Sequence, residues 1–126
     1  MIGIDIVDIR RFKKFYQKFN TKALERFLNK DEIVLSNLKI ETLAGFFASK
    51  EAVSKALGTG IGKDLGFHQI RLYKSDQNAP YFTLPRSIIE KYDIVESSLS
   101  ITHEKEYAIA VVYIKSNTNT QKKLYH

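Results

Sequence analysis

The sequence contains no cysteine, and none of its apolar runs is long. Without cysteine the fold cannot rely on disulfide bonds, and metal sites built on thiolates are excluded. The longest apolar run, Ala108 to Ile114, is far shorter than the roughly 20 residues that a membrane-spanning helix needs. The first residues also lack the basic and apolar segments of a secretory signal. We therefore expect a cytoplasmic protein without a membrane partner.

Acidic residues are scarce in one stretch near the N-terminus. Between Arg10 and Lys30 there is a single acidic residue, Glu25, against eight basic ones. The basic residues are Arg10, Arg11, Lys13, Lys14, Lys18, Lys22, Arg26 and Lys30. This stretch accounts for the whole positive excess of the chain, whose formal net charge is +6. Such a cluster attracts a polyanion, and charge alone does not distinguish a nucleic acid from an anionic lipid or an acidic protein.

The hydrophobic pattern predicts a single α+β domain over residues 1–114 and a polar, frayed tail over residues 115–126. Alternating isoleucines predict a half-buried strand over residues 2–9, and the spacing of four aromatic residues predicts an amphipathic helix after it. A long central helix is expected from about residue 40 to residue 57, ending at Gly58. Further strands are expected over residues 67–73, 81–84, 97–103 and 106–114, and short helices over residues 23–28, after Asn29 and from Pro85 to Tyr92. We therefore expect a mainly antiparallel sheet packed on the long central helix.

Asp5 and Glu51 each place a carboxylate among apolar residues. Glu51 falls near the centre of an apolar stripe on the central helix, and Asp5 interrupts the isoleucines of the first strand. An unpaired buried carboxylate costs on the order of several kcal/mol, so each side chain needs a partner or solvent. An ion pair with Lys55 would satisfy Glu51, and a solvated strand face would satisfy Asp5. Alternatively, both hold a hard cation such as magnesium, which favours few carboxylates, several waters and substrate phosphates.

A glycine-rich segment and a histidine are further candidates for chemistry. Residues 58–62 (GTGIG) and Lys63 can bring backbone amides and positive charge close to a phosphate, although a helix that ends in glycine produces the same pattern. The segment is not a Walker motif, because it follows a helix and does not end in GK[ST]. His103 shares a predicted strand face with Leu99 and Ile101, where a histidine can be structural or can reach a cleft.

Three segments of the chain form a pattern when they are taken together. They are Gly3-Ile4-Asp5-Ile6 with Arg11 after it, FASKEAVSKALGTG over residues 47–60, and Ser100-Ile101-Thr102-His103 followed by Tyr107-Ala108. In order and spacing they resemble the holo-acyl-carrier-protein synthase group of the phosphopantetheinyl transferases. The middle segment is the most specific, and the resemblance covers nearly the whole chain.

This resemblance implies a trimer with active sites between subunits, and transfer of 4'-phosphopantetheine from coenzyme A to a serine of an apo acyl carrier protein. The implied products are holo-acyl carrier protein and adenosine 3',5'-bisphosphate, and the implied pathway is fatty acid biosynthesis. The implied magnesium ligands are Asp5 and Glu51, and the implied catalytic residues are Glu51, Lys55 and His103. Contacts to coenzyme A are implied for Lys55, Gly58, Thr59, Gly60, Lys63, Thr102 and His103. The acidic carrier protein is implied to bind Arg11, Lys14 and Lys18.

Several alternatives stay open at this point. The serine proton needs an acceptor, for which His103 and a water held by magnesium are both candidates. The family usually has arginine where this chain has Phe46, so we expect a charged contact to coenzyme A or a neighbouring subunit to be missing. A nucleic-acid-binding module would explain the basic stretch but not Glu51, and a non-catalytic binder of coenzyme A would explain the glycine segment. We expect no nucleic-acid partner.

Overall fold

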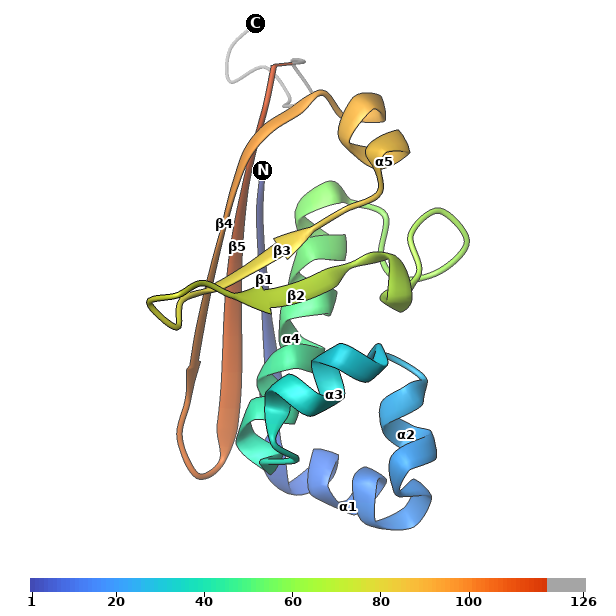
Figure 1. Cartoon of the computed structure of the whole chain (residues 1–126), viewed down its shortest axis with the longest axis vertical. Coiled ribbons are helices and arrows are strands. Elements are labelled where there is room, and N and C mark those ends of the chain that lie inside the picture. The colour runs from blue at the N-terminus through green and yellow to red at the C-terminus, as the bar shows by residue number, and fades with distance from the viewer. Residues whose placement is uncertain (118–126) are drawn as a thin grey trace, which may run out of the picture.

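One long helix lies against a three-stranded antiparallel sheet, and the remaining elements gather around this pair (Figure 1). The computed structural model describes residues 1–117. Its elements are β1 (Ile2–Asp8), α1 (Ile9–Phe19), α2 (Thr21–Glu25), α3 (Lys30–Ser36), α4 (Ile40–Leu57), the 3₁₀ helix η1 (Phe67–Gln69), β2 (Arg71–Lys74), β3 (Pro80–Thr83), α5 (Arg86–Lys91), β4 (Ile94–His103) and β5 (Tyr107–Ser116). The sheet has the order β1-β5-β4, and β2 and β3 form a separate antiparallel hairpin. The expected α+β class with a mainly antiparallel sheet is confirmed.

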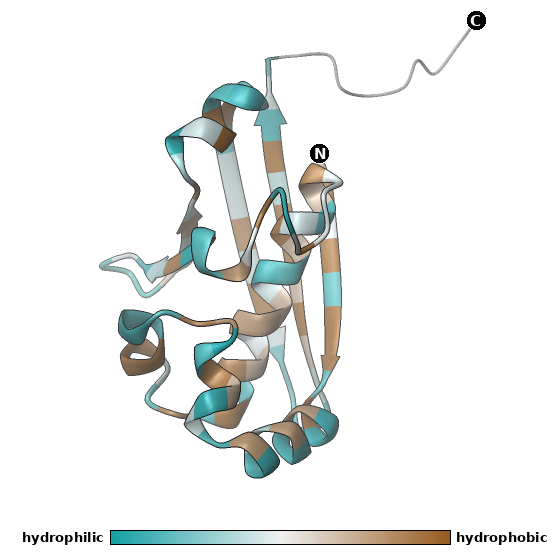
Figure 2. Ribbon diagram, turned by 90° about the vertical axis from the view of Figure 1, so that its right-hand side faces the viewer, coloured by the Kyte–Doolittle hydropathy of each residue, from teal (hydrophilic) through white to brown (hydrophobic). Residues whose placement is uncertain are grey.

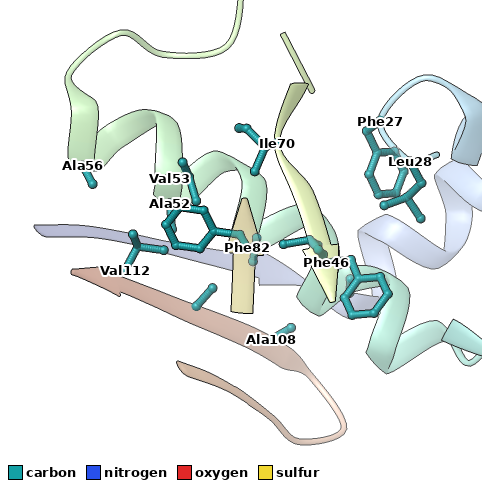
Figure 3. Packing of buried hydrophobic residues seen from close by; sticks show 14 of the residues in the cluster. Phe27, Leu28, Phe46, Ala52, Val53, Ala56, Ile70, Phe82, Ala108 and Val112 are labelled. Atoms are coloured by element: carbon teal, nitrogen blue, oxygen red, sulfur yellow. The ribbon is translucent and has the colours of Figure 1, made fainter. Parts of the chain in front are cut away.

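The core lies between α4 and the inner face of the sheet (Figure 3). Every second residue of β5 is buried, because successive side chains of a strand point to opposite faces. The buried residues of β5 are Ala108, Ala110, Val112 and Ile114. Phe82 of the hairpin joins Ala52 and Val53 of α4 in the same cluster. Helix α4 therefore has buried residues on most of its circumference. The single apolar stripe that we expected accounts for only part of its buried surface.

Helix α4 approaches strand β1 most closely at Gly3. A Cβ at Gly3 would lie 1.9 Å from the backbone oxygen of Ala52 and 2.6 Å from the backbone nitrogen of Ala56. Ala48, Ala52 and Ala56 are themselves small and buried, so the helix backbone can lie directly on the strand. Gly58 ends the helix at φ 77°, a left-handed conformation that glycine adopts without strain.

The N-terminal helices are held by side-chain caps and by an aromatic cluster. Oδ1 of Asp8 accepts hydrogen bonds from the amides of Arg10 and Arg11 and so begins α1. Asn29 and Glu32 form a capping box at the start of α3. The rings of the aromatic cluster belong to Phe12, Phe27, Phe47 and Phe67. These helices lie together at the lower end of α4 in Figure 1, and Figure 2 shows that hydrophilic and hydrophobic residues alternate along them.

The outer face of the sheet is apolar on β1 and β5, and no element among residues 1–117 covers it there. Ile2, Ile4 and Ile6 expose 72, 58 and 59% of their surface, and Val111 and Tyr113 expose 40% each. The residues between the isoleucines face α4, where the close approach of the helix excludes large side chains. The period-two pattern thus correctly predicts a half-buried strand, but the isoleucines lie outside the core of this chain.

Several expected boundaries are wrong. Helix α2 spans Thr21–Glu25 and not residues 23–28, and strand β4 begins at Ile94 and not at residue 97. Residues 67–69 form η1 and not the start of a strand, because Oε1 of Gln69 accepts a hydrogen bond from the amide of Gly66 and closes a turn. Strand β5 continues to Ser116, because Lys115 and Ser116 still pair with β4. Residues 115 and 116 therefore do not belong to the expected tail over residues 115–126, and residues 118–126 lie outside the described part. No helix within residues 1–117 is long and apolar enough to cross a membrane.

We predict that Gly3→Ala destabilises the fold by about 3 kcal/mol or more, because the added methyl group meets backbone atoms that cannot move aside. The measurement is urea unfolding followed by circular dichroism. Gly62→Ala is the matched control, since a Cβ there meets nothing within 4 Å, and it should change stability by no more than about 0.5 kcal/mol. Equal stability of the two variants would show that α4 does not lie this close to β1.

Candidate active site

Strand β1 and helix α4 bring Asp5 and Glu51 to one pocket. The pocket has a volume of about 420 Å³ and lies between β1, α1 and α4. Its lining residues are Asp5, Ile6, Val7, Asp8, Arg11, Phe12, Phe15, Phe47 and Glu51. The two carboxylates, which are far apart in the sequence, therefore share one cavity. Their role as metal ligands stays a prediction.

Lys55 forms an ion pair with Asp5. Its Nζ lies 2.8 Å from Oδ1 of Asp5 and donates a second hydrogen bond, of 3.2 Å, to the carbonyl oxygen of Ile4. No ion pair within residues 1–117 includes Glu51, so the alternative that Lys55 neutralises Glu51 through an i,i+4 pair is wrong. The alternative of a solvated strand face is also wrong, since the Asp5 side chain is only 14% exposed. The Lys55 side chain is 52% exposed and remains open to an anion in solution.

The electrostatic environment of Glu51 favours binding of a cation. Partial burial raises the pKa of Glu51 above its ordinary value of 4.5, and the negative charge of Asp5 raises the pKa further. Lys55 lowers the pKa, but it is the smallest of the three effects. The negative charges of Asp5 and Glu51 therefore lie close together, and Lys55 neutralises them only in part. A divalent cation would supply the missing positive charge.

The donor set fits a hard cation such as magnesium. Two carboxylates beside an open cavity leave room for waters and substrate phosphates, which is the coordination that magnesium favours. Residues 1–117 contain no group of three or more His, Asp or Glu side chains that could form a closed metal cage. A cation bound here would therefore depend on the substrate for part of its coordination.

The other walls of the pocket were not predicted from the sequence. Phe12, Phe15 and Phe47 also line the pocket and make part of its surface apolar, and Asp8 lines the pocket while it caps α1. The signal was present in the spacing of the aromatic residues, which we interpreted only as the core-facing side of a helix. The cavity is therefore lined by both charged and aromatic side chains.

The glycine segment after α4 differs from the expectation in one respect. The amides of Gly58, Thr59 and Gly60 all donate to carbonyl groups in the last turn of α4. The expectation that these amides face a phosphate is therefore wrong, because they close the C-terminus of the helix. A Cβ at Gly58 or Gly60 would meet nothing within 4 Å, so a ligand can still approach the segment closely. Lys63 is exposed there, and the contacts of these residues with coenzyme A stay a prediction.

Thr102 and His103 lie apart from the carboxylate pocket. They end strand β4, which strand β5 separates from β1. His103 pairs with Ala108, and Ala108 pairs with Val7, so His103 is two strand spacings, or about 10 Å, from β1. Both residues line a different pocket, of about 330 Å³, together with Ile6. By strand alternation Thr102 shares the face of Ile6, whereas His103 shares the face of Ala108. Within residues 1–117, neither residue reaches the cavity of Asp5 and Glu51.

The basic residues expected to bind a partner lie together on α1. Arg11, Lys14 and Lys18 are exposed, whereas Phe12 on the other side of the helix is buried. Lys18 also places its Nζ 5.3 Å from the ring centre of Phe19. Because Arg11 lines the carboxylate pocket as well, the basic face leads from solvent to that pocket.

Phe46 has a structural role in this chain. Its side chain is only 3% exposed and belongs to the core on the side of α4 that faces β4. It borders a pocket of about 160 Å³ together with Lys74 and His103. The position therefore offers no charged group to a ligand.

Comparison with known proteins gives a consistent result. A model of the 4'-phosphopantetheinyl transferase superfamily matches residues 1–112. The holo-[acyl-carrier-protein] synthase of Wolinella succinogenes is 54% identical over 112 residues, which are 89% of this chain and 94% of that protein. The synthase of Helicobacter pylori strain G27 is 51% identical over 117 residues, which are 93% of this chain and 98% of that protein.

Solved structures agree with the sequence relatives. The crystal structure of the Helicobacter pylori synthase in complex with coenzyme A has a TM-score of 0.88 and 50% identity, and the match covers 91% of this chain and 100% of that chain. A Bacillus anthracis synthase, in complex with coenzyme A (3',5'-ADP), has a TM-score of 0.77 and 38% identity over 92% of this chain and 96% of that chain. With its fold, its motif segments and its relatives in agreement, the chain belongs to the 4'-phosphopantetheinyl transferase superfamily, among the holo-[acyl-carrier-protein] synthases.

Proposed function

We propose that this protein transfers the 4'-phosphopantetheine group of coenzyme A to a serine of an apo acyl carrier protein, with magnesium as cofactor. The products are holo-acyl carrier protein and adenosine 3',5'-bisphosphate, and the reaction serves fatty acid biosynthesis in the cytoplasm. Relatives at 54 and 51% identity carry the name of this activity. The observation that carries the proposal is the meeting of Asp5 and Glu51 in one pocket beside a basic helix, with Lys55 bound to Asp5.

The reaction moves a phosphoryl group between two oxygens. The serine oxygen forms a bond to the β-phosphorus of coenzyme A, while the bond from this phosphorus to the bridging oxygen breaks and adenosine 3',5'-bisphosphate leaves. Asp5 and Glu51 would hold the magnesium ion, which supplies charge neutralisation at the phosphate oxygens when bound. Lys55 is anchored beside Asp5 but half exposed, so its ammonium group can neutralise a phosphate oxygen.

The proton of the serine needs an acceptor, and His103 is the side-chain candidate. Within one chain His103 lies on β4, away from Asp5 and Glu51. We therefore propose that His103 and Thr102 act in the site of a neighbouring copy. Coenzyme A would then lie between the carboxylate pocket of one subunit and the end of β4 of the next.

The outer face of the sheet supports assembly into a trimer. Ile2, Ile4 and Ile6 form a row of exposed apolar side chains, and Val111 and Tyr113 lie beside them on β5. Contiguous apolar surface of this kind favours association, because burial removes it from water. Thr102 lies on the same face as Ile6, and the neighbouring His103 borders a pocket with both, so association there would bring this end of β4 close to another copy.

The direct test of the function is Glu51→Gln, which keeps the shape of the side chain and removes its charge. We expect this variant to fold and to lose magnesium-dependent transfer by roughly 100-fold or more. The assay incubates the protein with coenzyme A, magnesium and apo carrier protein, and detects the added arm by mass spectrometry. The matched control is Glu90→Gln on α5, an exposed position that should retain full activity. Parent-like turnover of Glu51→Gln would remove this residue from the metal site.

The same variant has an expected effect on stability without metal. Because the pKa of Glu51 is raised in the folded protein, ionised Glu51 increasingly destabilises the fold as the pH rises above 4.5. Below that pH both folded and unfolded states are protonated, and the effect disappears. Glu51→Gln should therefore raise the Tm of the metal-free protein at about pH 7 but not below pH 4.5, as measured by calorimetry. A lower Tm at neutral pH contradicts the assigned environment.

The basic helix generates a prediction about the carrier protein. Reversing the charge at Lys14 and Lys18, which do not line the carboxylate pocket, should raise the KM for the acidic carrier about tenfold or more at low salt and weaken its salt dependence, while kcat changes little. Reversal at Lys91 and Lys115 is the matched control, since both are exposed and belong to α5 and to the last residues of β5. Figure 1 shows α5 and this end of β5 at the opposite end of the molecule from α1. An unchanged KM in the α1 variant argues against carrier docking on this helix.

A site divided between copies predicts complementation. Glu51→Gln and His103→Ala should each have low activity alone, but co-expression should restore part of it, because some interfaces then combine an intact Glu51 with an intact His103. The measurement is the specific activity of the mixed trimer, whose mass is checked by light scattering. Full turnover of His103→Ala would exclude the histidine as proton acceptor, and a monomeric active protein would exclude the divided site.

A further inference from the structure

A fully buried ion pair lies one residue from Glu51 on helix α4. Glu32 of α3 and Lys50 of α4 are both 0% exposed, and Oε1 of Glu32 lies 2.8 Å from Nζ of Lys50. Burial lowers the pKa of Lys50, although the hydrogen bond and charge of Glu32 oppose this shift. The pair is therefore held against a desolvation penalty. Neither residue contacts the pocket of Asp5 and Glu51, and the transfer reaction uses neither.

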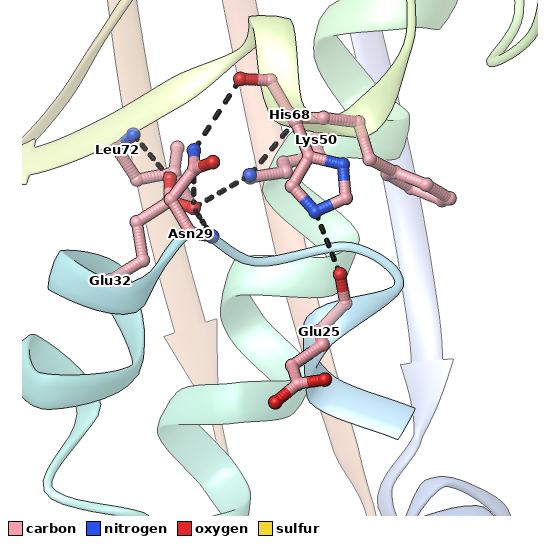
Figure 4. Close-up of polar contacts among 7 residues, drawn as sticks. Glu25, Asn29, Glu32, Lys50, His68 and Leu72 are labelled. Carbon is pink, nitrogen blue, oxygen red and sulfur yellow. Dashed lines mark hydrogen bonds and ion pairs between the residues drawn. The ribbon is translucent and has the colours of Figure 1, made fainter. Parts of the chain in front are cut away.

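The polar atoms of this pair join four elements at one point (Figure 4). Oε1 of Glu32 also accepts a hydrogen bond from the amide of Asn29 at 2.7 Å, and Oε2 accepts one from the amide of Leu72 at 2.7 Å. Nζ of Lys50 donates a further hydrogen bond to the carbonyl oxygen of Phe67 at 3.0 Å. The pair therefore connects the start of α3, the middle of α4, η1 and β2.

These contacts also fix the exit of the loop that follows α4. The hydrogen bond from Lys50 to Phe67 spans residues 58–66, which form this loop. Beside it, Nε2 of His68 lies 2.7 Å from the carbonyl oxygen of Glu25 on α2. The loop begins at the end of α4 and returns to a point held by the middle of the same helix. Its path therefore depends on where Lys50 holds η1.

The rotation of α4 about its axis depends on contacts away from the sheet, and this ion pair is the directional one beside the apolar packing of Phe46 and Val53. The side of α4 that lies on the sheet consists of small residues, which allow a close approach but interlock little with the strand. Lys50 and Glu51 are adjacent, so their side chains leave the helix about 100° apart. A rotation of only about 10° would displace a carboxylate that lies about 6 Å from the axis by about 1 Å, which is enough to impair catalysis strongly.

We propose that Glu32 and Lys50 are positioning residues for the transfer site: they hold the rotation of α4 that turns Glu51 toward Asp5, and they anchor the loop that carries Lys63. The inference rests on the function proposed above. Replacing a buried ion pair by uncharged side chains of similar size is often neutral for stability. What the pair adds is therefore a defined geometry, imposed by the hydrogen bond between the two side chains and by their hydrogen bonds with Asn29, Phe67 and Leu72.

The test is the double variant Glu32→Gln with Lys50→Met, which removes both charges and preserves side-chain length. We expect its Tm to stay within about 4 °C of the parent. Amide hydrogen exchange in residues 58–72 of the ligand-free protein should become about tenfold faster. Affinity for coenzyme A, measured by calorimetry, should fall about fivefold, and kcat at 25 °C should fall about tenfold.

Ile88→Ala is the matched control, because Ile88 is a buried residue of α5 whose loss destabilises the fold without touching this pair. It should lower the Tm at least as much as the double variant, yet keep parent-like exchange in residues 58–72 and parent-like kcat. If the double variant also keeps both, the pair contributes to packing only and the inference is overturned. The same holds if the control loses kcat to the same extent.

If the double variant does not fold, a second variant still tests the inference. Glu32→Asp keeps the charge but is one methylene shorter, so it cannot reach Lys50 and Leu72 from the same backbone position, and it should give the same faster exchange in residues 58–72. Unchanged exchange in this variant overturns the inference. A parent protein that transfers no phosphopantetheine refutes the proposed function, whereas unchanged exchange in the variants refutes the positioning role, so the two failures are distinguishable.

Discussion

The contact of two backbones at Gly3 is the constraint on which the site depends. The backbone of α4 at Ala52 and Ala56 lies where a side chain of β1 would otherwise be. Glu51 and Lys55 precede these alanines by one residue each, and Asp5 follows Gly3 by two residues on the same face of the strand. The close approach therefore brings both helix side chains beside Asp5. Any residue larger than glycine would push the helix away and separate the carboxylates.

Much of the fold was predictable because its signals are local. The central helix, its end at Gly58 and the start of α3 after Asn29 follow from periodicity and capping, which neighbouring residues determine. The orientation of β1 was not predictable in this way. An alternating strand has an apolar and a polar face, and the usual inference buries the apolar one. Here the face of β1 that carries Gly3 and Asp5 packs against the small residues of α4. This is a tertiary contact, and the alternation of residues along a strand does not predict it.

The candidate site shows the same limit. Asp5 and Glu51 were predictable as a pair because each is a carboxylate among apolar residues, and the family resemblance linked them. The partner of Lys55 was not, since an i,i+4 pair with Glu51 and a cross-element pair with Asp5 are equally compatible with the sequence. The ion pair of Glu32 and Lys50 was missed altogether, because charged residues are usually exposed and burial emerges only when α3, α4 and β2 converge. The glycine segment shows the reverse case, in which a pattern typical of ligand binding also closes a helix.

The separation of β4 from β1 by β5 has a consequence for the behaviour of the protein in dilute solution. If the end of β4 completes the pocket of another copy, every catalytic centre exists only while subunits are associated. Specific activity then depends on protein concentration and falls when dilution favours free chains, even though each chain keeps its fold. Such an enzyme is switched off by dissociation without any change of shape within the subunit.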